Sequence, residues 1–308
     1  MPIRRPAHST ILTRSVAVLA LACVVGLLNI PPARAAAARH PLIVFMTDFG
    51  TIDDAVAICK GVMKRIAPEA EIIDLTHQVT PFSISEGARM LVRTAQYYPS
   101  GTVFVTVIDP GVGTSRKSIV LRTKSGQYFV LPDNGLVTQV ADRYGVDGIR
   151  EITNPGWLLA GSSSSTFHGR DVYSPVAAHL AHGEDWTQIG PVQVSFTRLD
   201  VPQAVVDAAG IKGLVVALDG PFGNLVTNVD RDAFLGLGYV VGDTVRVKLG
   251  ASELSLPYAA TFGGVAQGKP LVFIDSRGLV SLAINQGNFA QAYAVTPPVP
   301  LVISRKRP

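Results

Sequence analysis

The chain has 308 residues, of which 47% are hydrophobic and 16% charged, and its formal net charge is +4. This composition excludes a disordered or collagen-like chain and provides enough apolar material for one or two packed domains. The net charge does not indicate nucleic-acid binding, because four arginines and no acidic residue lie within residues 1–35, whose removal would bring it to 0.

The first 35 residues have the layout of a secretory signal. Arginines precede the uncharged apolar run Val16–Ile30, and an A-x-A-type cleavage site, Ala33-Arg34-Ala35, follows it. We therefore expect residues 1–35 to be a signal peptide and the mature protein to be exported, periplasmic or secreted. An uncleaved anchor is the alternative. After cleavage no run of 18 apolar residues remains, so no membrane span is expected.

The mature chain would keep one cysteine, because Cys23 lies inside the signal segment and Cys59 is the other one. A single cysteine forms neither an internal disulfide nor a cysteine-based zinc site. Cys59 lies in an apolar-periodic stretch, which favours a buried thiol.

Residues 41 to 191 alternate between strand and helix patterns. Strands are expected at 42–46, 71–75, 101–108, 118–122 and 128–131, and helices at 53–66, 84–97, 136–144 and 171–182. This alternation predicts an α/β fold whose mainly parallel sheet is covered on both faces. We place this N-terminal three-layer domain at residues 40–191.

The pattern changes beyond residue 191. Short alternating runs occur at 214–218, 244–249, 271–274 and 279–283, with glycine-rich turns between them, and 205–213 is read as a connector or edge element. These runs predict a smaller C-terminal β-barrel domain at residues 205–303.

Several polar residues follow the expected strands, where α/β sheets bind ligands. Asp48, His77 and Asp109 stand at such ends. A glycine-containing loop separates Asp109 from Arg116, and His168 precedes a glycine at a helix entrance. Spacing alone leaves open whether Asp109 and Arg116 form a surface ion pair, and whether the histidines are structural.

A second cluster contains three acids. Asp48, Asp53 and Asp54 are suited to holding calcium, to binding ribose hydroxyls or to capping the next helix. The stretch resembles the calcium motif of nucleoside hydrolases, but Met46 stands where that motif has an aspartate. A calcium-dependent nucleoside hydrolase is therefore one alternative, although we predict no metal site.

Several separated motifs are typical of one family. They are Thr47-Asp48-Phe49-Gly50, Lys60-Gly61, Asp74-Leu75-Thr76-His77, Asp109-Pro110-Gly111-Val112-Gly113-Thr114, Pro132-Asp133-Asn134-Gly135-Leu136, Thr166-Phe167-His168-Gly169-Arg170-Asp171 and Asp219-Gly220-Pro221-Phe222-Gly223-Asn224. Through them, residues 41 to 302 resemble the S-adenosyl-L-methionine hydroxide adenosyltransferases, relatives of fluorinating and chlorinating enzymes.

The resemblance implies hydrolysis of S-adenosyl-L-methionine, a small adenosyl substrate, to adenosine and L-methionine without a further cofactor. It also implies a homotrimer with sites between subunits. Asp109, Arg116 and His168 would be the catalytic set. Substrate contacts are implied for Asp48 with the ribose, for Asn224 and Phe262 with the adenine, and for Asp219, Ser276 and Arg277 with the methionine end.

The resemblance also bears on the choice between water and halide. In halogenating relatives an uncharged residue replaces the acid at Asp109, and small hydroxyl residues stand at Val112 and Gly169. The three residues here favour water. A halide-using adenosyl transferase and a non-catalytic exported binding protein for adenosyl compounds are the remaining alternatives.

Overall fold

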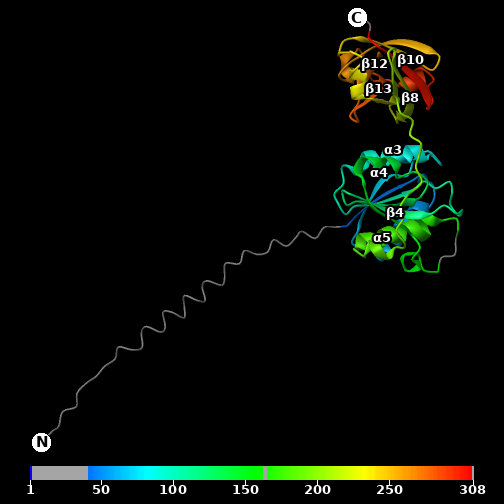
Figure 1. Cartoon of the computed structure of the whole chain (residues 1–308), viewed down its shortest axis with the longest axis vertical. Helices are drawn as coiled ribbons and strands as arrows, with labels where there is room; N and C mark the ends of the chain where they lie inside the picture. The colour runs from blue at the N-terminus through cyan, green and yellow to red at the C-terminus, as the bar shows by residue number, and fades with distance from the viewer. Residues whose placement is uncertain (2–40, 162–164, 307–308) are drawn as a thin grey trace. The chain divides into compact units, whose positions relative to one another are not determined.

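Two β-sheets organise residues 41–306 of the chain in the computed structural model (Figure 1). The structure describes Met1, residues 41–161 and residues 165–306. The expected signal peptide, apart from Met1, therefore lies outside the described residues, as does 162–164 in the serine tract. The domain limits at 40–191 and 205–303 stay predictions.

The first sheet has six strands and is mainly parallel. In spatial order they are β2 (Glu71–Thr76), β1 (Leu42–Thr47), β3 (Val103–Val107), β5 (Tyr128–Pro132), β4 (Ser118–Thr123) and β6 (Val146–Glu151). The pairs β1–β2, β1–β3 and β3–β5 are parallel, and β4 runs antiparallel to both neighbours. The carboxyl ends of β1, β2 and β3 therefore lie at one edge of the sheet.

Helices cover both faces of this sheet. The helices are α2 (Ala55–Ile66), α3 (Ile84–Ala95), α4 (Thr138–Tyr144) and α5 (Ser174–His182). Phe45 on β1 belongs to the same core cluster as Met63 of α2, whereas the next residue, Met46, packs in the cluster of Leu91 on α3. Figure 1 shows α3 and α4 on the face opposite α5. The predicted three-layer α/β arrangement is confirmed.

The second sheet is antiparallel and nearly closed. Its strands follow the order β11 (Ser252–Pro257), β10 (Thr244–Leu249), β14 (Val299–Ser304), β8 (Gly210–Asp219), β9 (Asn224–Asp230), β13 (Leu279–Ile284) and β12 (Pro270–Ile274), with β7 (Val205–Val206) beside β8. A bridge between Tyr258 and Val272 joins the two ends. The side chains of Phe234 and Phe289 are fully buried in its core. A barrel-like C-terminal part is thus confirmed.

Short helical segments complete the described chain. They are η1 (Pro155–Trp157), η2 (Gly169–Tyr173), η3 (Trp186–Gln188), α6 (Arg231–Leu235), η4 (Phe262–Gly264) and α7 (Phe289–Ala292). The segment η2 is a π-helical turn, so the single helix expected at 171–182 is a π-turn followed by α5. None of the described helices is long and apolar enough to cross a membrane.

Candidate active site

The loop after β3 carries the first two residues of the site. Asp109 stands two residues after the end of β3, and Arg116 stands two residues before the start of β4. Gly113 lies between them at φ 78°, and a Cβ atom there would stand 2.8 Å from the carbonyl oxygen of Ser165. Glycine therefore lets this loop lie against the backbone that leads into His168.

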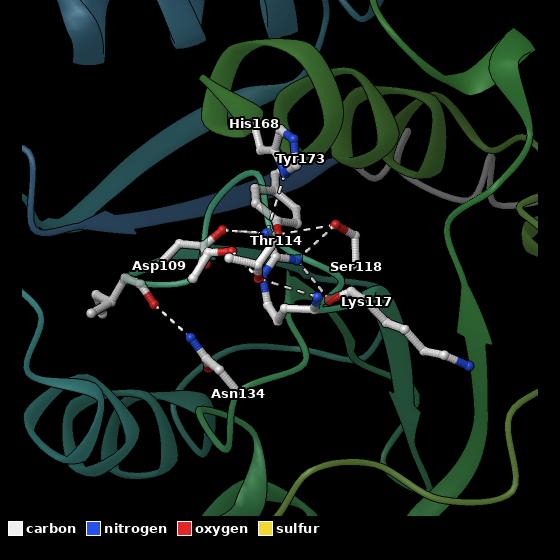
Figure 2. A network of polar contacts seen from close by, with 10 residues as sticks. Asp109, Thr114, Lys117, Ser118, Asn134, His168 and Tyr173 are labelled. Atoms are coloured by element: carbon white, nitrogen blue, oxygen red, sulfur yellow. Dashed lines mark hydrogen bonds and ion pairs between the residues drawn. The ribbon is translucent and has the colours of Figure 1, made fainter. Parts of the chain in front are cut away.

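Arg116 is the centre of a largely buried polar network. Figure 2 labels its partners Asp109, Ser118 and His168. Its Nη2 donates to Oδ2 of Asp109 at 2.6 Å and lies 3.2 Å from Nδ1 of His168. Its Nη1 donates to the carbonyl oxygen of Lys117 at 2.7 Å and to Oγ of Ser118 at 3.0 Å. A guanidinium held by four acceptors has one available orientation.

His168 immediately precedes the π-turn η2, and its side chain contacts this network. Because a guanidinium only donates hydrogen bonds, Nδ1 of His168 must accept, which places the proton of a neutral imidazole on Nε2. Burial and the charge of Arg116 both hold the pKa of His168 below its usual value. The histidine is therefore neutral at physiological pH.

Asp109 is nearly inaccessible, with 5% of its side chain exposed against 9% for Arg116. Burial raises the pKa of the Asp109 carboxyl above its ordinary value, although the adjacent Arg116 opposes the shift. Oδ1 of Asp109 is buried and has no hydrogen-bond partner among the described residues. An ionised carboxylate is a proton acceptor, and Oδ1 is the oxygen that no described side chain occupies.

A cavity of about 250 Å³ adjoins these groups. Asp109 and His168 line it together with Asp48, whereas Arg116 does not. The remaining lining residues are Phe49, Pro81, Phe82, Val112, Thr166, Phe167 and Gly169. Oδ2 of Asp48 accepts a hydrogen bond from the backbone of Phe82 at 2.8 Å. The structure thus brings three of the predicted site residues to one cavity and a fourth directly behind it.

The other acids near Asp48 have different surroundings. Oδ1 of Asp53 accepts from the backbone nitrogen of Ala55 at the start of α2, and Asp54 is the N-terminal cap residue without a side-chain bond. Across residues 41–161 and 165–306, no group of three or more His, Cys, Asp or Glu side chains is arranged to hold a metal ion. Helix capping is the reading that suits Asp53.

His77 lies outside the cavity. Its Nδ1 is 2.9 Å from the hydroxyl of Thr47, and its Nε2 is 3.1 Å from Asp74 without the alignment of a hydrogen bond. Its carbonyl oxygen accepts from Gly50 at 2.7 Å. These contacts join the ends of β1 and β2, so the structural reading applies to this histidine.

Cys59 is a buried thiol on α2, as the sequence indicates. Burial raises its pKa to about 11.

The remaining predicted residues lie on the second sheet. Arg277 forms a fork with Asp219, at 2.6 and 2.8 Å, and its Nε donates to Asp275 at 2.7 Å. Burial alone would lower the pKa of Arg277, but its carboxylate partners raise it above the ordinary value. Asp275 also accepts from Ser281 at 2.8 Å, which fixes this cluster to β13.

Two cavities meet at Asp219. One, of about 920 Å³, is lined by Asn224, Phe262 and Ile284, among others, and the second, of about 550 Å³, by Ser276 and Arg277. Neither shares a residue with the cavity of Asp109 and His168. Within one chain, the predicted substrate contacts therefore form two separate groups, one on each sheet.

Sequence reasoning missed three polar residues of these groups. Ser118 begins a strand and Tyr173 belongs to a helical segment, so neither carries a local signal of chemistry. Asp275 stands in a turn whose Gly278 has positive φ, and a turn aspartate usually has a local structural role. These three residues are identified only by their contacts in the fold with Arg116, Asp109 and Arg277.

Known proteins match almost all of the described chain. Family models of the N-terminal and C-terminal domains of SAM hydroxide adenosyltransferases match residues 43–190 and 213–301. An (R)-S-adenosyl-L-methionine hydrolase of Salinispora arenicola is 41% identical over 84% of this chain and 96% of its own length. A fluorinase of Actinopolyspora mzabensis is 33% identical over 82% and 94%.

A crystal structure of an uncharacterized conserved protein from Thermotoga maritima superimposes with a TM-score of 0.82. It has 43% identity and covers 85% of this chain and all of its own. The chain belongs to the SAM hydroxide adenosyltransferase family.

Proposed function

We propose that this chain hydrolyses S-adenosyl-L-methionine to adenosine and L-methionine. The observation that carries the proposal is the buried contact of Asp109, Arg116 and His168 beside a cavity that also contains Asp48. Similarity to a protein named as an (R)-S-adenosyl-L-methionine hydrolase supports the same reaction.

The reaction needs an activated water and no acid for the leaving group. The oxygen of the water attacks C5′ while the C5′–S bond breaks. The electron pair of the C5′–S bond remains on sulfur. Methionine then leaves as a neutral thioether, because the sulfonium carried the positive charge. One proton must leave the attacking water, and the site must supply its acceptor.

We assign that proton to Asp109. The Asp109 side chain lines the cavity, and burial raises the pKa of its carboxyl above the ordinary value, which makes the ionised form a stronger base. A proton on Nδ1 of His168 would place a cationic imidazole against the Arg116 guanidinium, so His168 is not the proton acceptor. Its Nε2–H instead donates a hydrogen bond to the water and fixes the position of the water.

Arg116 acts from behind the cavity. Its charge is permanent and lies within 3.2 Å of both partners, so it stabilises the ionised form of Asp109 and the neutral form of His168. It also offsets the negative charge that develops as water is deprotonated.

The charge of the cavity distinguishes water from halide. A halide ion beside the Asp109 carboxylate would bring two negative charges together in a desolvated site, whereas water is neutral. Val112 and Gly169 contribute no hydroxyl group to the lining. These features favour hydrolysis over the reaction implied by the name of the fluorinase relatives.

For the substrate contacts we propose that the two groups of residues, one on each sheet, bind different parts of the substrate. Asp48 would hold the ribose beside the water. Asn224 and Phe262 would hold the adenine, and Asp219, Ser276 and Arg277 the methionine end. Because the two groups occupy cavities without shared residues, we propose that two subunits of a homotrimer complete each site.

Location is proposed from the sequence. Residues 1–35 would direct the chain to the periplasm or outside the cell. Fractionation of cells that express the full chain would test this, because retention in the cytoplasmic fraction contradicts export.

The activity is tested by incubating the mature protein with S-adenosyl-L-methionine and EDTA and separating the products by chromatography. Equimolar adenosine and methionine are expected, with a rate that EDTA leaves unchanged. Cleavage of inosine or uridine that stops on chelation would replace the proposal with a nucleoside hydrolase. A 5′-halo-adenosine formed in chloride or fluoride buffer would replace it with halide transfer.

A further inference from the structure

Behind the proposed catalytic groups, four polar side chains close a hydrogen-bonded ring. Arg116 Nη1 lies 3.0 Å from Oγ of Ser118, and this hydroxyl is 3.1 Å from the hydroxyl of Tyr173. The Tyr173 hydroxyl is 3.4 Å from Oδ2 of Asp109, which is bound 2.6 Å from Arg116 Nη2. In Figure 2 the side chains of Asp109, Ser118 and Tyr173 point toward one another.

Donor and acceptor chemistry fixes the direction around the ring. Arg116 only donates, so Ser118 Oγ accepts from it and retains its own proton. An ionised Asp109 only accepts, so the one proton of Tyr173 is donated to Oδ2. Ser118 therefore donates to Tyr173 across their 3.1 Å contact.

The backbone explains how Tyr173 reaches this position. Tyr173 is the last residue of the π-turn η2, and His168 is its N-terminal cap residue, five positions earlier. The i→i+5 bonding of a π-turn brings residues five apart closer to one face than an α-helix would, and both side chains face Arg116. Their ring centroids are 6.4 Å apart, and the guanidinium carbon of Arg116 is 5.9 Å from the Tyr173 ring centre.

We propose that Tyr173, supported by Ser118, is a positioning residue that holds the ionised Asp109 carboxylate at Oδ2, beside Arg116, for its role as acceptor of the proton of the attacking water. This inference rests on the proposed function. Tyr173 is fully buried and does not line the cavity, so it acts through Asp109.

The hydroxyl has an electrostatic consequence as well. Arg116, His168 and the backbone of Gly111 oppose the effect of burial on the Asp109 pKa. A hydrogen bond to the ionised carboxylate favours that form, so we expect the Tyr173 hydroxyl at Oδ2 to act in the same direction. The other charged or titratable groups facing Asp109 are Arg116 and His168, and Asp171 faces His168. Burial raises the pKa of Tyr173 itself, so it keeps its proton at neutral pH.

The test compares Tyr173→Phe with Tyr144→Phe. The Tyr144 hydroxyl also donates a hydrogen bond, to the carbonyl oxygen of Val92 at 2.9 Å, but Tyr144 lies on α4 and not in the ring. Tyr173→Phe should lower kcat about tenfold while KM changes less than about twofold. The acidic limb of its pH–rate profile should move up by about one pH unit. Tyr144→Phe should leave kcat and the acidic limb unchanged.

Ser118→Ala is the second variant and keeps the proposal testable if Tyr173→Phe does not fold. It leaves the tyrosine hydroxyl near Asp109 without its donor, so a smaller shift in the same direction is expected. An unchanged acidic limb in a folded Tyr173→Phe overturns the proposal, even where kcat falls. If only Ser118→Ala folds, an unchanged acidic limb in the pH–rate profile of that variant overturns the proposal.

A direct titration separates this proposal from the proposed function. The γ-carboxyl carbon of Asp109, followed by NMR against pH in the protein without substrate, should show a higher pKa in Tyr173→Phe than in the wild type. That shift is expected even if the wild type releases no adenosine, a result that would refute the hydrolase assignment alone. Equal Asp109 titrations in the two proteins overturn the role of Tyr173.

Discussion

Nη2 of Arg116 lies 3.2 Å from Nδ1 of His168, so a permanently charged donor faces the ring atom that a proton would otherwise occupy. Protonation of His168 would put two cations in contact within a buried site. This relationship makes the neutral imidazole part of the folded structure.

The first prediction concerns pH and stability. The pKa of folded His168 is lowered, so its contribution to stability is present above the ordinary histidine pKa of about 6.5 and is lost as pH falls toward the lower folded value. His168→Gln keeps an acceptor for Arg116 but does not titrate, so its Tm should fall less between pH 7.5 and about 5.5.

His182→Gln is the control because the sign there is opposite. A hydrogen bond with Glu69 raises the pKa of His182, so its contribution is present below the ordinary pKa and is lost as pH rises through the folded value. His182 is exposed, and its effect should be small. Parallel Tm profiles of the wild type and His168→Gln would contradict the first prediction.

A second prediction concerns the shape of the Arg116 side chain. Arg116→Lys keeps the charge but loses the planar fork that reaches Asp109, His168 and Ser118 together. Adenosine release should fall by about 100-fold, measured as kcat at saturating substrate. Arg198→Lys, at an exposed ion pair with Asp142, should retain the wild-type rate. Comparable rates for Arg116→Lys and the wild type would show that charge alone suffices.

The third prediction uses the space around Gly169. A Cβ atom there would lie 3.0 and 3.1 Å from ring carbons of Phe49 and 3.3 Å from Phe167, and all three residues line the cavity. Gly169→Ala should therefore displace these rings and reduce kcat/KM about tenfold. Gly61→Ala on α2 meets nothing within 4 Å, so it should leave kcat/KM unchanged and stabilise the fold by up to ~1 kcal/mol. Unchanged kcat/KM in Gly169→Ala would mean that the rings move freely.

Sequence patterns predicted the first sheet well because its strands have strong signals. The β-branched run at 101–108 contains β3, and the apolar run at 42–46 lies within β1. By contrast, β6 has a single buried residue, and prolines at 297, 298 and 300 weaken the strand pattern of β14. The sequence pattern did not predict strand β9, because the strand begins at Asn224, inside a motif that we interpreted as a turn.

The site was predictable where chemistry coincides with a motif. Asp109, Arg116 and His168 stand in recognisable segments, and the fold places them in contact. Tyr173 was not predictable, because a π-turn changes which residues share a face, and ordinary helical spacing would direct it elsewhere. The pairing of Asp275 with Arg277 likewise depends on side-chain contacts in the folded turn.

A fourth prediction follows from that pairing. Asp275 has 4% of its side chain exposed and holds Arg277 by Nε, so Asp275→Asn removes a charge partner without a large change in volume. Arg277 should then be less firmly oriented, and KM for S-adenosyl-L-methionine should rise about tenfold with kcat changed little. Asp243→Asn, at another ion pair of the second sheet, is the control. A fall in kcat at unchanged KM would place Asp275 outside substrate binding.

The last prediction tests whether two subunits complete each site. His168→Ala damages the group of residues on the first sheet, and Asp219→Ala the group on the second, and each variant alone should be inactive. In a randomly mixed trimer, about one quarter of the sites would combine an intact first group with an intact second group from the neighbour.

Subunits of the two variants that are co-expressed, or exchanged by mild denaturation, should therefore regain about one quarter of the wild-type activity. Variants mixed without exchange should remain inactive, since no site then contains both intact groups. Sites built within single chains would give no recovery after exchange, because every chain carries one damaged group.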